Sequence, residues 1–326
     1  MATTASAAGS IARFGLGTAA VGRPGYITLG RDLDLPAERS VEALRARTHA
    51  LLDAAYAAGV RYFDTARSYG RAEEFVGEWL ATRPAGADVT VGSKWGYTYT
   101  ADWRASGVPV HEVKEHSTAV FDRQLRESRA LLGSRLDVYL VHSVTPDSPA
   151  LTDRALQERL AALAAEGVRV GLSTSGPAQG ETVRAALAVT VAGRPLFSAV
   201  QSTWNVLETS AGPALAEAHA AGLLVVVKEG MANGRLADRN ATGPDTAALR
   251  TLAAAHGATC DALALAAVAA QPWADLVLSG AATEAQLTSN LAAAHLALTP
   301  DDLATLTPLT EPAEHYWKTR AALPWA

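Results

Sequence analysis

The chain has 326 residues, of which 49% are hydrophobic and 19% charged, a composition typical of a soluble globular protein with a large core. The net charge of −5 at pH 7, without any Lys/Arg-rich stretch interleaved with aromatic residues, argues against nucleic-acid binding. The single cysteine, Cys260, excludes an internal disulfide and a CxxC metal site.

The sequence also predicts the cellular location of the protein. The N-terminal residues lack the charged start and apolar core of a signal peptide, and no run approaches the roughly 18 apolar residues of a membrane span. We therefore expect a cytoplasmic protein with no membrane association. No cluster of His, Asp or Glu has the spacing of a metal site, so no metal is predicted. The oligomeric state stays open.

Short apolar runs alternate with helical patterns along the chain. The expected strands are 15–22 (running into a loop), 61–65, 89–94, 136–142, 168–173, 197–201, 223–228 and 276–279. The expected helices begin at Ser40 (ending at Gly59) and span 72–82, 116–132, 152–166, 179–191, 213–221, 245–256, 261–270, 283–295 and 300–306. The remaining tail is expected to be irregular.

This alternation predicts an α/β fold with a parallel sheet covered by helices. Eight strand–helix units in a chain of this length, without a linker or a break in composition, favour a closed (β/α)8 TIM barrel over an open doubly wound sheet. We expect residues 1–326 to form a single barrel domain. In such barrels the functional residues gather at the C-terminal ends of the strands.

One glycine motif suggests a different fold and has to be weighed. Residues Gly15–Ala20, GLGTAA, match the GxGxxA fingerprint of dinucleotide-binding Rossmann folds. A true fingerprint opens directly into a helix, whereas no helical pattern begins here until Ser40. A strand loop whose glycines admit a ligand close to the backbone is the better interpretation.

Four ionisable residues of different kinds fall at the ends of neighbouring predicted strands. Asp64, Lys94 and His142 end the second, third and fourth strands, and Tyr69 lies in the loop after the second. Taken singly, each has an ordinary structural interpretation, such as a capping Asp, a surface Tyr or a core His. Together at one rim of a barrel they predict a catalytic site.

The chemistry of these four groups is coherent. A tyrosine with a pKa near 10 donates its proton reluctantly at neutral pH. A neighbouring ammonium favours the phenolate, and a carboxylate keeps that ammonium charged. A relay of Asp64, Lys94 and Tyr69 could therefore tune a phenol for proton transfer to a carbonyl oxygen, while a neutral His142 orients the substrate.

These residues, in their order and context, resemble the catalytic tetrad of the aldo-keto reductases. FDTARSYG, GSKWG and LDVYLVHS are similar to the family's second, third and fourth strand motifs. The likeness continues through GVRVGLSTSG, VQSTWN, LVVVKEGMANGRL and GAATEAQLTSN, from Gly15 to about Leu298. It implies a barrel that binds NADP(H) or NAD(H) without a Rossmann fold. It also implies reversible hydride transfer to a small-molecule carbonyl, with Tyr69 as the general acid.

The resemblance also implies a cofactor-binding set. Ser173 and Gln201 match residues that bind the nicotinamide carboxamide, and Thr18 matches a position near its ribose. A helix N-terminus suits the cofactor phosphate. The remaining positions carried over by the resemblance are Gly230, Gly234 and Arg235 after the seventh strand and Gly280, Thr283, Gln286 and Asn290 after the eighth.

This sequence departs from the family pattern at two places. Lys228 stands where many relatives have a Tyr that stacks on the nicotinamide. Three interpretations stay open: Lys228 contacts the cofactor, Lys228 extends into solvent, or Trp204 stacks on the nicotinamide instead. Ala282 stands where many NADP-specific relatives have Arg or Lys, which weakens the expectation of NADP without establishing NAD. For the substrate, we predict contacts from Trp95, Trp103 and Trp317, and a C-terminal tail, about 307–326, near the active site.

The sequence therefore predicts an NAD(P)H-dependent reductase of aldehydes or ketones. Three alternatives stay open: an NAD(P)-dependent alcohol or sugar dehydrogenase working in the oxidative direction, a cofactor-binding regulatory subunit, and a barrel aldolase or lyase with Lys94 as Schiff base.

Overall fold

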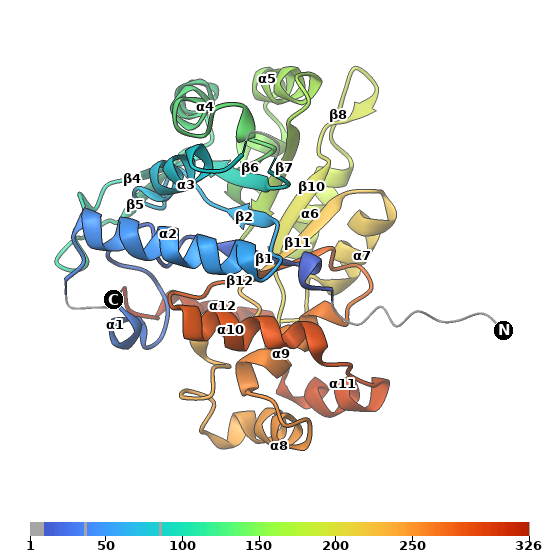
Figure 1. Cartoon of the computed structure of the whole chain (residues 1–326). Helices are drawn as coiled ribbons and strands as arrows, with labels where there is room; N and C mark the ends of the chain where they lie inside the picture. The colour runs from blue at the N-terminus through green and yellow to red at the C-terminus, as the bar shows by residue number, and fades with distance from the viewer. Residues whose placement is uncertain (1–9, 36–37, 85–86, 326) are drawn as a thin grey trace.

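The computed structural model describes residues 10–35, 38–84 and 87–325. Eight parallel strands close into a barrel surrounded by helices (Figure 1), so the predicted (β/α)8 TIM barrel is confirmed. The strands follow one another around the barrel in chain order, with the last pairing back to the first. They are β1 Phe14–Gly17, β2 Tyr62–Asp64, β3 Thr90–Trp95, β6 Val138–Val144, β7 Arg169–Thr174, β10 Ala199–Thr203, β11 Leu224–Lys228 and β12 Leu276–Ser279.

Helices cover the outside of the barrel, and side-chain caps fix where many of them begin. Ser40, Ser117 and Asp153 each accept a hydrogen bond from a backbone N–H of the first turn, which satisfies a donor that the helix leaves free. The helices are α1 Arg31–Asp34, α2 Val41–Ala57, α3 Ala72–Ala81, α4 Thr118–Leu132, α5 Arg154–Ala165, α6 Gln179–Leu187, α7 Gly212–Ala220, α8 Ala247–Ala255, α9 Cys260–Ala269, α10 Glu284–Leu291, α11 Pro300–Leu306 and α12 Ala313–Ala321.

The barrel interior is packed with side chains. Tyr62, Leu140, Val226 and Leu278 are among the buried residues of a small inner cluster, and a larger apolar core lies between the strands and the helices. The interior is therefore a core and not a channel. This leaves the loops beyond the C-terminal strand ends as the place where a ligand can bind.

Parts of the chain differ from the expectation. The third loop forms a hairpin of β4 Tyr97–Tyr99 and β5 Glu112–Lys114, and a second hairpin, β8 Thr190–Val191 and β9 Arg194–Pro195, follows α6. The prediction of an irregular tail was wrong, because residues 313–321 form α12. This helix is too short to show a strong apolar period, and it is anchored by tertiary burial of Tyr316 and Trp317.

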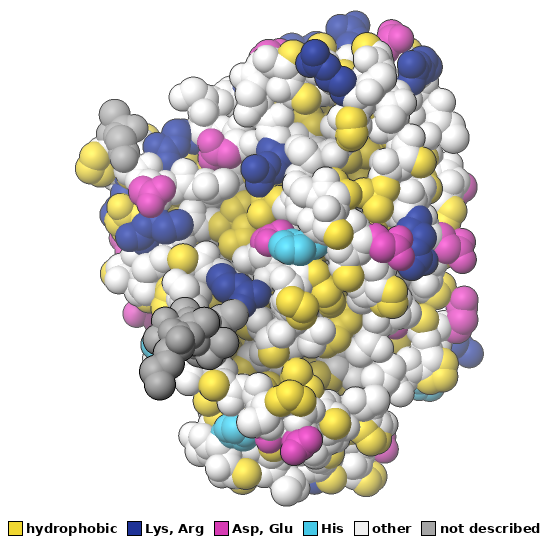
Figure 2. Space-filling view, turned by 90° about the vertical axis from the view of Figure 1, so that its right-hand side faces the viewer, with side chains coloured by type: hydrophobic (Ala, Val, Ile, Leu, Met, Phe, Trp, Pro, Cys, Tyr) yellow, Lys and Arg dark blue, Asp and Glu magenta, His cyan; other side chains and the backbone are white. Residues whose placement is uncertain are grey.

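The surface is mixed in charge and polarity. On the face shown in Figure 2, acidic and basic side chains are interspersed with apolar ones. Among the described residues no single helix has the length and apolarity to cross a membrane, and only a pair bent by 89°, Pro244–Ala255 with Cys260–Ala269, reaches those thresholds together.

Candidate active site

The barrel brings the four predicted catalytic residues together. Asp64 ends β2, Lys94 lies one residue before the end of β3, and His142 lies in β6. Tyr69 stands in the loop between β2 and α3, with its ring centroid 5.6 Å from that of His142 and 4.8 Å from the Lys94 Nζ. Residues separated by up to 78 positions thus share one rim, because parallel strands end at the same edge of the barrel.

Asp64 and Lys94 form a buried ion pair beneath Tyr69. Both are at most 3% exposed, and the Lys94 ammonium contacts Asp64 Oδ2 while donating to the Thr65 carbonyl at 2.9 Å. Gln201 Nε2 donates to Asp64 Oδ1 at 2.8 Å, and the Thr18 hydroxyl donates to the Asp64 carbonyl at 2.9 Å. Lys94 and Gln201 thus hold one carboxylate oxygen each, as a buried charge requires, while Thr18 holds the backbone of Asp64.

An irregularity in β6 presents His142 to the site. The β6–β7 register shifts between Val141 and Val144, and Ser143 adopts a positive φ of 55°. The backbone is held there because the Ser143 N–H donates to Ser173 Oγ at 2.8 Å and the His142 carbonyl contacts His116 Nε2 at 2.8 Å. Bulges of this kind re-aim side chains beside active sites.

His142 is neutral at neutral pH. Burial lowers its pKa well below the usual range, and Lys94, Lys228 and Arg23 lower it further. The Nδ1 atom is buried and makes no hydrogen bond within the described part of the chain. A neutral imidazole can still donate one hydrogen bond, so this side chain can orient a substrate oxygen without adding a charge.

The electrostatics of Tyr69 differ from the expectation. Burial raises the pKa of the phenol well above 10, Asp64 raises it further, and Arg23 is the main cation that lowers it. Lys94, whose Nζ lies 4.8 Å from the ring centroid, is not among the largest influences on this pKa. The phenol therefore keeps its proton firmly in the absence of ligand, as a proton donor must.

Two glycines allow the Tyr69 loop to pack closely against the loop after β1. A Cβ atom on Gly22 would lie 2.4 Å from the Ala72 Cβ and 2.5 Å from the Tyr69 carbonyl oxygen. A Cβ on Gly70, which has a φ of +62°, would lie 2.5 Å from the Gly22 carbonyl oxygen. The position of Tyr69 thus depends on the absence of side chains at both glycines.

Replacing Gly22 with Ala is expected to push the Tyr69 loop out of place. We expect a loss of about 1–3 kcal/mol in the free energy of unfolding, as overpacking typically causes. If Tyr69 is a proton donor, displacing it by about 1 Å should also lower turnover by about 10²-fold. Urea unfolding and steady-state kinetics measure the two effects. Gly243→Ala is the matched control, because its Cβ meets no atom within 4 Å and its φ is −77°; equal effects of the two substitutions would contradict the prediction.

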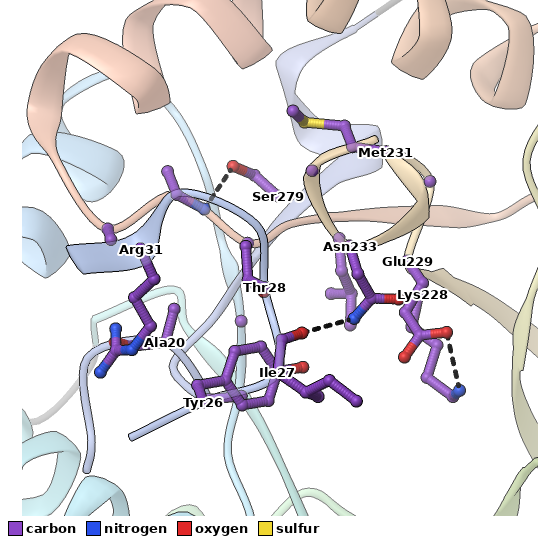
Figure 3. A pocket seen from close by; sticks show the side chains of 18 of the residues that line it. Ala20, Tyr26, Ile27, Thr28, Arg31, Lys228, Glu229, Met231, Asn233 and Ser279 are labelled. Atoms are coloured by element: carbon purple, nitrogen blue, oxygen red, sulfur yellow. Dashed lines mark hydrogen bonds and ion pairs between the residues drawn. The ribbon is translucent and has the colours of Figure 1, made fainter. Parts of the chain in front are cut away.

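A cavity of about 540 Å³ extends from this rim along the loops after β1, β11 and β12. Figure 3 shows its middle, where the Asn233 amide donates to the Ile27 carbonyl at 2.9 Å. Of the predicted site residues, ten line it: Asp64, Tyr69, His142, Gln201, Lys228, Gly230, Gly234, Gly280, Gln286 and Asn290.

Several polar residues that were predicted to belong to the site do not line the cavity. Lys94 and Thr18 support Asp64, and the buried Ser173 hydroxyl accepts from the Ser143 amide. Thr283 caps α10 by accepting from the Gln286 N–H at 3.1 Å, and Arg235 pairs with Glu311. These residues are outside the set that lines the cavity, so any effect on a ligand passes through their neighbours.

The predicted aromatic contacts also lie elsewhere. Trp95 is completely buried and packs on Phe121, with ring centroids 5.1 Å apart. Trp204 packs edge-on against Trp273, and Trp103 donates to the Arg39 carbonyl. Trp317 is buried in a separate apolar cluster that includes Leu249, Leu263 and Tyr316. Trp95 and Trp103 were predicted from the loop after the third strand, Trp317 from the family's tail and Trp204 as a stacking residue. In the structure, their large apolar rings pack against other parts of the core.

The cavity wall also contains charged residues that were not predicted, among them Arg23, Glu112, Glu229 and Arg320. Glu229 has a positive φ of 56° and takes two hydrogen bonds from the Arg320 Nε, at 2.9 and 3.0 Å. Glu229 could have been predicted, because it is an acidic residue directly after the C-terminal end of β11. The tail residue Arg320 and the loop residues Arg23 and Glu112 had no signal, because only tertiary contacts bring them here.

The far half of the cavity carries a different set of charges. Asp34, Asp238 and Asp261 line it, and Arg239 Nη1 pairs with Asp34 at 2.6 Å. Arg47 of α2 approaches the same end from outside, with its Nη1 3.3 Å from the Ala282 carbonyl. No group of three or more His, Cys, Asp or Glu side chains suited to a metal ion occurs among the described residues.

Comparison with known proteins identifies the class to which this fold and site belong. The model of the aldo/keto reductase family matches residues 14–311, and the chain therefore belongs to that family.

Individual relatives are distant. The chain is 27% identical over 195 residues to the aldo-keto reductase ausK of Aspergillus calidoustus, and 26% identical to that of Emericella nidulans. The match covers 58% of this chain and 48% of the relative, so the chain spans about half the length of the curated relatives it matches.

Solved structures share the fold. A protein assigned as an aldo-keto reductase from Pseudomonas aeruginosa superposes with a TM-score of 0.61 at 24% identity, covering 88% of this chain and 93% of that one. A protein assigned as a 2,5-diketo-D-gluconic acid reductase B gives a TM-score of 0.62 at 23% identity, covering 94% and 92%.

Proposed function

We propose that the protein is an NAD(P)H-dependent reductase of aldehydes or ketones in which Tyr69 is the general acid. The observation that supports this most directly is the meeting of Tyr69 and His142 on a cavity wall, above the buried Asp64–Lys94 pair. The cavity offers a carbonyl oxygen one firmly protonated phenol and one neutral imidazole, which is the arrangement that proton donation to that oxygen requires.

The cavity also fits a nicotinamide dinucleotide. Its volume of about 540 Å³ is in the usual range for ligand sites. A Cβ on Gly280 would meet no atom within 4 Å, so open space lies directly over the backbone before α10. We propose that Gln201 and Lys228 lie at the nicotinamide end, with Gln286 and Asn290 at the adenosine end. When bound, the cofactor supplies or accepts the hydride.

The choice between the two cofactors depends on opposing charges. Arg47 beside Ala282 supports NADP(H), because it can supply the cation that Ala282 lacks. Asp238 and Asp261 support NAD(H), since carboxylates repel a phosphate and accept hydrogen bonds from ribose hydroxyls. We keep NADP(H) as the proposed cofactor and NAD(H) as the alternative.

The chain's own residues divide the work. Tyr69 donates its proton to the carbonyl oxygen, and His142 hydrogen-bonds that oxygen and fixes its direction. Asp64 and Lys94 form an ion pair with no net charge beneath the phenol. When Tyr69 has given up its proton, the Lys94 ammonium is close enough to stabilise the phenolate that remains. In the reverse direction the same atoms oxidise an alcohol, so a dehydrogenase or sugar-dehydrogenase role uses the same site.

Two rival functions have less support. A Schiff-base mechanism needs an accessible amine, whereas the Lys94 ammonium is 1% exposed and bonded to Asp64 and Thr65. A cofactor-binding regulatory subunit would share the cavity, but it would not need Tyr69 and His142 to face the cavity together.

Titration of the protein with NADPH and NADH tests the proposal. We expect one of the two to bind and to be oxidised when a panel of aldehydes and ketones is added, with absorbance at the nicotinamide band as the readout. Binding without turnover of any carbonyl or alcohol would favour the regulatory alternative. Absence of binding to either cofactor would refute the reductase.

The charge of Lys228 gives a pH-dependent prediction. Burial lowers its pKa to about 8, so the ammonium loses its proton as the pH rises from 7 to 9. A cation beside the nicotinamide disfavours the positively charged oxidised ring relative to the neutral reduced ring. We therefore expect the preference for reduced over oxidised cofactor, measured by the two Kd values, to shrink across this interval.

Lys228→Met is the control for this titration. It should show a small preference that does not change between pH 7 and pH 9, since no charge remains at this position to titrate. A wild-type preference that stays constant over the interval would contradict the role of Lys228.

A further inference from the structure

A second histidine lies behind the site and contacts the backbone of the first. The His116 ring is 5% exposed and lies outside the set of residues that lines the cavity. Its Nε2 lies 2.8 Å from the His142 carbonyl oxygen, and its Nδ1 lies 2.7 Å from the Ser148 hydroxyl. The ring therefore joins the segment before α4 to β6 and to the loop that follows β6.

The two partners decide which nitrogen of His116 carries the proton. A carbonyl oxygen only accepts hydrogen bonds, so Nε2 donates to the His142 carbonyl. Burial lowers the pKa of the ring to about 4, so His116 is neutral near pH 7 and its Nδ1 accepts from the Ser148 hydroxyl. The Ser148 oxygen in turn accepts from the Ala150 N–H at 3.3 Å. Donors and acceptors thus alternate along one series of hydrogen bonds that ends at the His142 carbonyl.

Close packing leaves the His116 ring little room to move. A Cβ atom on Gly96 would lie 2.5 Å from the His116 Cδ2 and 2.8 Å from its Nε2. The Trp95 ring packs edge-on against the imidazole, with the ring centroids 5.9 Å apart. The next residue, Ser117, caps the start of α4. The ring is therefore held by β3 and α4, which are elements other than the strand that carries His142.

The hydrogen bond from His116 meets the backbone where β6 is irregular. His142 lies beyond the last residue pair of β3 and β6, Trp95 with Val141, and inside the register shift against β7. The following residue, Ser143, has a positive φ of 55°, which is unusual for a residue with a side chain. The His142 carbonyl belongs to the planar peptide unit that joins these two residues. Fixing this oxygen therefore restricts ψ of His142 and the direction in which its side chain leaves the backbone.

Two interpretations of His116 can be compared. A buried histidine with two hydrogen-bond partners is commonly a structural residue, and its loss then lowers stability and impairs every step alike. Here, however, the donor of the ring is spent on the backbone oxygen of the residue that is proposed to orient the substrate. A small change at this oxygen is passed directly to the imidazole of His142, and misplacing a reacting group by about 1 Å can cost about 10²-fold in rate.

We propose that His116 is a positioning residue for carbonyl reduction, which holds the His142 imidazole in the direction that the substrate oxygen requires. This inference rests on the proposed reductase function and on the role proposed there for His142. His116 itself touches neither substrate nor cofactor, because it lies outside the cavity wall. Its contribution should therefore appear in kcat and not in the affinity for the cofactor.

Two substitutions of His116 differ in the hydrogen bonds that they keep. His116→Leu has a side chain of similar size without a donor, and we expect it to lower kcat for aldehyde reduction by about 10–10²-fold. His116→Gln supplies an amide N–H for the His142 carbonyl and should recover most of that loss. The Kd values for NADPH and NADH, measured by fluorescence titration, should stay within about twofold of the wild-type values in both variants.

A double-mutant cycle with His142→Ala shows whether His116 acts through His142. We expect His116→Leu to lower kcat in the wild-type background and to leave the kcat of His142→Ala within about twofold. A residue that only supports the fold would lower kcat by the same factor in both backgrounds. Ser148→Ala is the milder second variant, which should lower kcat less than His116→Leu does, and only while His142 is present.

Tyr139→Phe is the matched control for a lost buried hydrogen bond on the same strand. The Tyr139 hydroxyl lies 3.2 Å from the Ser128 hydroxyl of α4, and its ring is completely buried. This variant should lose stability in urea unfolding without a change in kcat, because its hydrogen bond is not connected to the His142 backbone.

The outcomes separate this proposal from the one on which it rests. Equal factors in the two backgrounds, or a His116→Leu variant with the kcat of the wild type, would overturn the positioning role while upholding the reductase. An unchanged kcat in His142→Ala would remove His142 from the mechanism and this inference with it. Failure of the wild-type protein to turn over any carbonyl would refute the reductase itself.

Discussion

Replacing Tyr69 with Phe is expected to lower kcat for carbonyl reduction by about 10²–10⁴-fold, the usual contribution of a general acid. The substitution removes one hydroxyl that faces the cavity and keeps the ring that packs against His142 and the Arg23 guanidinium. The Kd for NADPH, measured by fluorescence titration, should therefore stay within about twofold of the wild-type value. An unchanged kcat would remove Tyr69 from the mechanism.

The control for this substitution is Tyr56→Phe, on α2 and outside the cavity, which should retain full activity. The pH profile adds a second readout. Burial and Asp64 raise the pKa of Tyr69 well above 10, so the phenol stays protonated at moderately alkaline pH. Deprotonation of Tyr69 should therefore not slow carbonyl reduction at any pH up to 10. Alcohol oxidation needs the deprotonated form and should accelerate as the pH rises.

Replacing Lys94 with Met is expected to impair both stability and turnover. The substitution leaves Asp64 buried without its counter-ion, and breaking a buried ion pair in this way typically costs about 3–5 kcal/mol in the free energy of unfolding. It also leaves an unbalanced carboxylate near Tyr69, which disfavours the phenolate formed on proton transfer. Urea unfolding and kcat measure the two effects.

The double variant Lys94→Met with Asp64→Asn separates them. Removing both charges should restore much of the lost stability, because no unpaired ion remains, but it should not restore turnover. Arg184→Met, which breaks the exposed pair with Glu217, should change stability little. A single Lys94→Met variant as stable as the wild type would show that the buried pair does not hold the site together.

The eight-stranded barrel was predictable because its signals are local. Each strand is a short apolar run, helices such as α4 have a periodic apolar face, and capping residues such as Ser40 and Ser117 mark helix starts. The tail helix α12 was missed because its nine residues become helical through burial of Tyr316 and Trp317 against other parts of the chain.

The proximity of the proposed catalytic residues was predictable for a related reason. Asp64, Lys94 and His142 occupy strand ends, and in a parallel barrel all strand ends meet at one rim, so their positions in sequence indicate their proximity in space. The aromatic residues follow no such rule. Trp95 directly follows Lys94 along β3, but successive side chains on a strand point to opposite faces, and Trp95 is buried in the core.

The sequence by itself determined the barrel, the family resemblance and the set Asp64, Tyr69, Lys94 and His142, because these depend on periodicity and on spacing along strands. Only the tertiary structure decided how the charges are shared. It buried Tyr69 beside Asp64, which raises the pKa of the phenol, and it brought Arg23, Glu112, Glu229 and Arg320 from distant segments to one wall. Such pairings depend on distances and burial across the folded chain, and these are not encoded in any local pattern.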